Sequence, residues 1–201
     1  MRKLTKLKHL YVWGCNRLKS KGIRTLTGLQ KLDLFHINGY KGADNEGTSK
    51  LEDLKDLHQL EGRLSISHLE SVEDASQAVA ACLGEKRFSD LVLNFECAVC
   101  GGGDRREGGG HIDMEILNGL QPHRDLEWLT IRNCEASILL PNWILSLHKL
   151  KSLRLGEFGN CELLSGPLGK LPSLEYLGFY YEVQNRDQII QKKKKENKKH
   201  L

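Results

Sequence analysis

Apolar residues recur along this chain in one spacing: an apolar residue, two others, a leucine, one other, and a second apolar residue. Seven such motifs centre on leucines at positions 10, 32, 64, 91, 129, 153 and 177, the third with one extra residue before its leucine. The alternation at the end of each motif is typical of a short strand with one buried face. Because one strand cannot bury that face alone, the pattern predicts stacked repeats that share a core.

The spacings between these leucines are 22, 32, 27, 38, 24 and 24 residues. Such a motif, returning every 20 to 29 residues or so, is typical of leucine-rich repeats. The sequence therefore predicts an α/β solenoid: an irregular horseshoe with a parallel sheet of one strand per repeat and short helices on its convex side. Helical spacing over residues 72–83, and a helix capped by Asp113, would supply two of these helices.

The widest spacing holds a glycine-rich stretch. Residues 101–110 contain six glycines and four charged residues, which cannot bury apolar surface. We therefore expect a flexible insertion at residues 97–112 within a solenoid that spans residues 1–184. A lysine-rich tail at residues 185–201 is predicted to be disordered.

The net charge of +4 comes from the tail, since residues 192–201 contribute +5 and leave the rest near −1. A near-neutral body offers no basic face to a nucleic acid, and no run approaches the roughly 20 apolar residues of a membrane span. The start of the chain does not resemble a signal peptide, and the six cysteines are scattered. These features predict a cytoplasmic protein, which the lysine-rich tail could direct to the nucleus.

Catalytic signatures and a phosphate-binding loop are absent from the sequence, so we expect no enzymatic activity and no cofactor. One constellation could carry metal or redox chemistry, namely Cys97 and Cys100 followed by His111. These three are weak metal candidates, because structural zinc needs four ligands and a second ligand pair is missing. Two free thiols in a loop are the simpler interpretation.

The strand residues that alternate with the leucines are predicted to point to the concave face. Tyrosine, tryptophan and arginine, which dominate protein-binding hot spots, recur there. The predicted partner-binding residues are Tyr11, Trp13, Phe35, Trp128, Arg132, Arg154, Tyr176 and Tyr180. We expect Trp128, Arg154 and Tyr180 to be the main anchors, although exposed aromatic residues could also merely cover the sheet.

Four stretches, at residues 60–72, 119–131, 140–143 and 167–177, resemble the leucine-rich region of plant coiled-coil nucleotide-binding disease-resistance proteins. The resemblance implies an intracellular immune receptor in which the solenoid acts as sensor and autoinhibitory clamp. Its partner would be a pathogen effector, a guarded host protein or a nucleotide-binding domain. With no phosphate loop in these residues, we expect the leucine-rich part without that domain. A small metal- or redox-responsive protein and a non-functional gene remnant are the alternatives.

The glycine-rich insertion is expected to be dispensable for the fold, since long surface excursions cost little loop entropy. Limited trypsin digestion should therefore cut first at Arg105 and Arg106, as mass spectrometry of the early fragments would show. If this segment resisted cleavage while other sites were cut, a bound metal or partner would be indicated instead.

Overall fold

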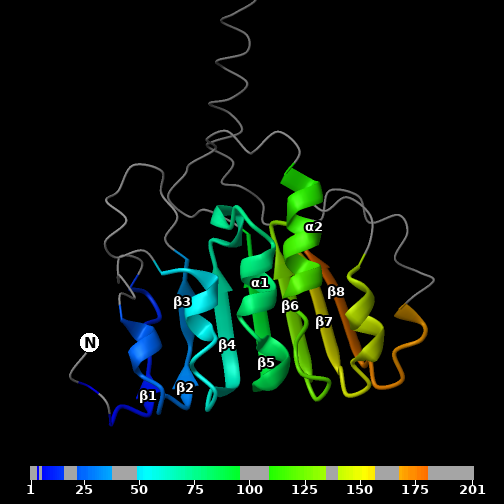
Figure 1. Cartoon of the computed structure of the whole chain (residues 1–201). Coiled ribbons are helices and arrows are strands. Elements are labelled where there is room, and N and C mark those ends of the chain that lie inside the picture. Colours follow the sequence, from blue (N-terminus) through cyan, green and yellow to red (C-terminus); the bar gives the residue numbers. More distant parts are fainter. Residues whose placement is uncertain are drawn as a thin grey trace, which may run out of the picture.

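The computed structural model describes residues 4, 6–15, 22–37, 49–95, 109–134, 140–156 and 168–180. All strand pairs in these residues are parallel. A two-stranded sheet contains β1 (His9–Leu10) and β2 (Lys31–Leu32). A six-stranded sheet follows in chain order, with β3 (Leu34–His36), β4 (Glu61–Ser67), β5 (Arg87–Asn94), β6 (Trp128–Arg132), β7 (Ser152–Gly156) and β8 (Tyr176–Tyr180) (Figure 1).

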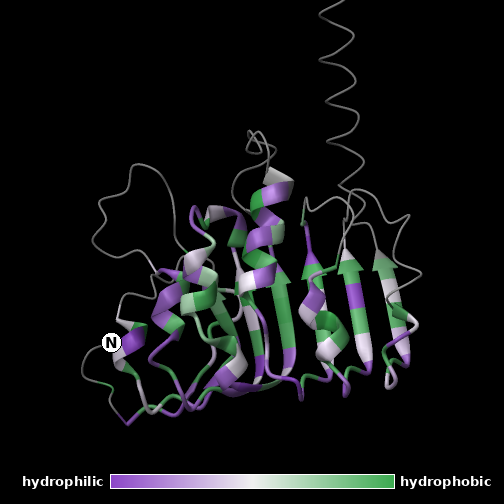
Figure 2. Ribbon diagram, turned by 45° about the vertical axis from the view of Figure 1, so that its right-hand side comes forward, coloured by the Kyte–Doolittle hydropathy of each residue, from purple (hydrophilic) through white to green (hydrophobic). Residues whose placement is uncertain are grey.

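The pairing of β4 to β8 follows the leucine motif. The five central leucines lie opposite one another in one row, namely Leu64, Leu91, Leu129, Leu153 and Leu177. The first four are fully buried, and the next apolar row, which runs from Ile66 to Leu155, is buried as well. Figure 2 shows apolar residues running along these strands. The predicted parallel sheet of stacked repeats is therefore confirmed for this part of the chain.

The helices pack against the apolar face of the sheet (Figure 1). They are α1 (Ser76–Ala80), α2 (Gly109–Gly119) and the 3-10 turns η1 (Ile23–Thr25), η2 (Leu51–Leu54), η3 (Leu69–Ser71), η4 (Leu83–Glu85) and η5 (Asn142–Ser146). Trp143 of η5 is buried and donates its indole N–H to the carbonyl of Leu117 at 2.8 Å. The buried polar group is thus satisfied across two neighbouring repeats. The horseshoe curvature and the convex position of the helices stay predictions.

The second motif differs from its predicted register. Phe35 is fully buried and pairs with Ile66 in the core row, whereas Leu34 pairs with Ser65 in the opposite row. The chain bends at Asp33, whose carboxylate accepts hydrogen bonds from the backbone N–H groups of Val12 (2.8 Å) and Trp13 (3.0 Å). The bend adds one residue between the two core positions, so the prediction that Phe35 lies on the exposed face was wrong.

The third motif contains an irregularity at Gly62. This glycine has φ +81°, in the left-handed region where a side chain is strained, and the pairing of β4 with β5 shifts there. The motif then resumes at Leu64 in register with the later repeats.

Helix α2 begins at Gly109, four residues before its predicted cap. Asp113 lies inside the helix and is buried, so the prediction that Asp113 caps it was wrong. Consequently the end of the expected glycine-rich insertion is helical, while residues 97–108 and the tail at 185–201 lie outside the described residues. Among the residues described, no helix has the length and apolar character needed to cross a membrane.

The leucine row predicts a graded response to truncation. Leu129→Ala should lower the free energy of unfolding by about 2–5 kcal/mol, because the buried leucine leaves a cavity between two covering strands. Leu177→Ala, in the same row but 41% exposed, should cost clearly less. Urea unfolding followed by circular dichroism measures both. Equal losses would contradict the position of Leu129 in the core.

Candidate functional site

The face of the sheet opposite the helices, here called the open face, is built by the residues that alternate with the core rows. Strand pairing arranges them in three rows. The first row holds Arg63, Asp90, Trp128, Ser152 and Tyr176, the second Ser65, Val92, Thr130, Arg154 and Gly178, and the third Asn94, Arg132, Gly156 and Tyr180. Each row therefore combines long side chains with small ones.

A carboxylate lies between two guanidinium groups on this face. Arg63 Nε is 3.4 Å from Asp90 Oδ2, across β4 and β5. Burial raises the pKa of Asp90, and the positive charges of Arg63 and Arg154 oppose that shift. Asp90 is thus partly desolvated, and both arginines partly compensate its charge.

Arg154 and Tyr176 form a cation–π pair, here called the Arg154–Tyr176 shelf. The guanidinium carbon of Arg154 lies 5.2 Å from the centre of the Tyr176 ring, within the range of a cation–π contact. The ring is seated over Gly178, where a Cβ atom would come within 2.8 Å of the ring carbon Cε1. Glycine at this position lets the tyrosine ring lie close to the strand.

Trp128 is 42% exposed and has a cation beside it as well. Lys151 Nζ lies 5.5 Å from the centre of the Trp128 ring and 2.7 Å from Glu127 Oε2. The hydrogen bond to Glu127 raises the pKa of Lys151. The charge of Lys151 is therefore already balanced within the protein.

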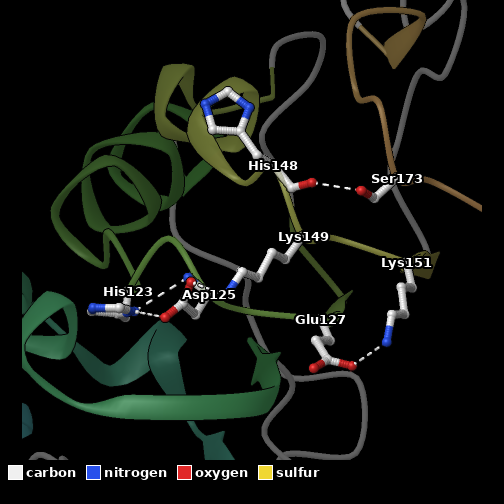
Figure 3. A network of polar contacts seen from close by, with 7 residues as sticks. All are labelled: His123, Asp125, Glu127, His148, Lys149, Lys151 and Ser173. Atoms are coloured by element: carbon white, nitrogen blue, oxygen red, sulfur yellow. Dashed lines mark hydrogen bonds and ion pairs between the residues drawn. The ribbon is translucent and has the colours of Figure 1, made fainter.

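The Glu127–Lys151 pair belongs to a polar network that joins successive repeats beside the open face (Figure 3). Lys149 Nζ lies 2.8 Å from Asp125 Oδ1, and this hydrogen bond lowers the pKa of Asp125. The next junction uses Ser173 Oγ, which donates to the carbonyl of His148 at 2.7 Å. Each of these contacts joins two neighbouring repeats, in addition to the backbone hydrogen bonds between their strands.

The structure brings together part of the predicted binding set. Trp128, Arg132, Arg154 and Tyr176 lie on the three adjacent strands β6, β7 and β8. The backbone of Tyr180 lies in the third row of β8, and its side chain is outside the described residues. Pairing aligns Trp128 with Tyr176, so Tyr176 shares its row and Tyr180 does not.

Two predicted residues lie apart from this group. Tyr11 and Trp13 are 69% and 73% exposed and follow β1, at the opposite end of the strand order from β8 (Figure 1). Phe35, as noted above, is in the core. The described binding candidates therefore divide into one cluster over β6–β8 and a separate aromatic pair.

Asp90 and Gly178 belong to this candidate surface and were not among the predicted residues. Asp90 directly precedes Leu91, as Trp128 directly precedes Leu129. Aligning the motifs would therefore have placed Asp90 on the same face as Trp128. A glycine within a strand, as at 178, often marks a close approach of another group.

Of the three metal candidates, only His111 lies within the described residues. Cys97 and Cys100 lie outside the described residues, while His111 lies on α2 with its side chain 81% exposed and its Nδ1 3.3 Å from Glu115. Within the described ranges, no group of three or more histidine, cysteine, aspartate or glutamate residues could hold a metal ion.

Stacked parallel strands, buried leucine rows and helices on one face define a leucine-rich-repeat protein. The profile of the family described as R13L1/DRL21 LRRs matches residues 51–181. This chain therefore belongs to the R13L1/DRL21 family of leucine-rich repeats, which confirms its resemblance to the corresponding region of plant disease-resistance proteins.

Curated relatives agree with this family. The chain is 34% identical over 158 residues to the putative disease resistance protein RGA1 of Solanum bulbocastanum, covering 77% of this chain and 14% of that protein. It is 35% identical over 162 residues to the putative disease resistance protein At3g14460 of Arabidopsis thaliana, covering 74% and 10%. The chain thus spans only a small part of the length of these relatives. No solved structure gives a significant match.

The raised pKa of Asp90 predicts a pH-dependent effect on stability. A carboxyl group with a raised folded pKa contributes stability below its ordinary pKa of 3.8, and this is lost as the pH rises through the folded value. Asp90→Asn should therefore increase the free energy of unfolding at neutral pH, and the gain should shrink as the pH falls toward 4. Urea unfolding across this range measures the effect.

Asp125→Asn is the matched control with the opposite sign. The pKa of Asp125 is lowered by Lys149, so its stability contribution is present at neutral pH and is lost in acid. A loss of stability from Asp90→Asn at neutral pH would show that its ion pair with Arg63 outweighs desolvation.

Proposed function

We propose that this chain is a protein-recognition module of plant innate immunity, acting in the cytoplasm as the leucine-rich part of a resistance protein. It would bind a pathogen effector, a guarded host protein or a nucleotide-binding domain, and so serve as sensor or autoinhibitory clamp. The sheet would form the concave side of a horseshoe across residues 1–184, with the helices on the convex side. The chain itself would carry no catalytic activity.

The cluster of Trp128, Arg154 and Tyr176 carries this proposal. These residue types contribute most to protein-binding hot spots, and here they occupy neighbouring strands of one face. Trp128 and Tyr176 are about half exposed, although the protein buries its other large apolar side chains in the core rows of the same strands from β4 to β7. Exposed aromatic residues beside an arginine on a rigid sheet make a surface suited to a protein partner.

The test compares two truncations of exposed apolar side chains. Trp128→Ala should weaken binding to a separately expressed nucleotide-binding domain of a related resistance protein by about 2 kcal/mol or more, as expected for a hot-spot residue. Val79→Ala is the control, since Val79 is 65% exposed on α1, away from the open face. Isothermal titration calorimetry measures both.

Equal effects of the two variants would exclude the open face as the binding surface for that domain. The same comparison with a candidate effector or host protein then distinguishes the three proposed partners.

A further inference from the structure

The open face carries more positive than negative charge. Along the three rows from β4 to β8 the charged residues are Arg63, Arg132, Arg154 and Asp90. Three guanidinium groups therefore accompany one carboxylate. Asp90 forms its ion pair with Arg63, on the β4–β5 side of the face, whereas Arg154 lies on β7.

Three lysines outside these rows are already paired. Lys31 lies 3.1 Å from Glu61, Lys149 lies 2.8 Å from Asp125, and Lys151 lies 2.7 Å from Glu127. Arg154 differs, because it is exposed and makes no ion pair with any other described residue. Its described interactions are the cation–π contact with Tyr176 and the longer-range attraction to Asp90. Arg154 is therefore the cation on this face best placed to meet a charge from outside.

The cation–π contact leaves hydrogen-bond donors of Arg154 available for a ligand. A guanidinium group carries five N–H donors in a planar fork, and contact with an aromatic ring does not use them as hydrogen bonds. That fork matches the two oxygens of a carboxylate in a bidentate hydrogen bond. Trp128, on the strand next to Arg154, adds an exposed apolar surface beside this position.

The negative charges around the shelf limit what can bind there. Asp90 attracts Arg154 from one side, and Glu127 and Glu175 lie next to Lys151 at the margin of the sheet. A densely charged chain such as a nucleic acid would meet these carboxylates along its length and be repelled. A single carboxylate beside an apolar side chain would avoid them.

We propose that the Arg154–Tyr176 shelf binds a carboxylate of an acidic protein segment, whose neighbouring apolar side chain packs against Trp128. This proposal rests on the proposed function, since it specifies the chemistry of the partner that the open face binds. Gly178 belongs to the same site, because it allows the Tyr176 ring to lie where it supports Arg154.

The experiment uses the full chain and a short fluorescein-labelled peptide in which glutamate alternates with leucine and glycine. A matched peptide with glutamine in place of glutamate, and a labelled single-stranded oligonucleotide, are the comparison probes. Fluorescence anisotropy should show that the glutamate peptide binds more tightly than both, and that added salt weakens its binding.

The decisive variant is Arg154→Gln, with Lys55→Gln as the control that removes an equal charge at an exposed position after η2. Arg154→Gln should weaken binding of the glutamate peptide at least about tenfold, as expected for a charge-assisted bidentate contact. Lys55→Gln should have little effect. Gly178→Ala should also weaken binding, because its methyl group displaces the Tyr176 ring from beneath Arg154. Thermal unfolding establishes that each variant is folded.

Three results would overturn the proposal: equal binding of the glutamate and glutamine peptides, equal losses from Arg154→Gln and Lys55→Gln, or tighter binding of the oligonucleotide. The proposed function is judged separately by the Trp128→Ala comparison with the nucleotide-binding domain. If Trp128→Ala weakened binding of that domain but the chain bound the glutamate and glutamine peptides equally, the open face would remain the proposed binding surface. The proposal of an acidic partner would then be rejected.

Discussion

Parallel pairing of each strand with the next repeat is the constraint on which the rest of this structure depends. A strand of five residues buries only one face, so its leucines are covered when both neighbours keep the same register. From Leu64 of β4 to Leu153 of β7 the leucines keep one register, and they are fully buried. The polar contacts at the strand starts, such as Lys151 with Glu127, add a second set of links with the same spacing. The positions of the open-face side chains follow from the same alignment.

The fold from β4 to β8 could be predicted from sequence because the leucine motif indicates both where each strand lies and which of its faces is buried. The second motif shows where that reasoning ends. Leu34 and Phe35 are adjacent apolar residues, so two registers fit the pattern equally well. The choice depends on Asp33, whose carboxylate binds backbone groups of the preceding repeat and bends the chain. Such a contact joins residues about twenty positions apart and leaves no periodic signal.

The sequence predicted which residues lie on the candidate surface, but not the contacts between their side chains. Alternation placed Trp128, Arg154 and Tyr176 on one face, as the strand pairing shows. Their interactions depend on the lengths of neighbouring side chains, which a motif does not encode. Arg154 reaches the ring of Tyr176 in the adjacent strand, and Trp128 has Lys151 beside it. Asp90 acquires its raised pKa from burial between repeats, a property of the assembled sheet.

The glycine beneath Tyr176 has an entropic consequence. The Tyr176 ring lies close to Gly178 and has the Arg154 guanidinium over it, so each side chain restricts the rotamers of the other. Ordering a long side chain on association commonly costs about 0.5–1.5 kcal/mol. At this position part of that ordering accompanies folding, because the two side chains already contact each other. A molecule that docks there would meet side chains already in place, and more of the contact energy would appear as affinity.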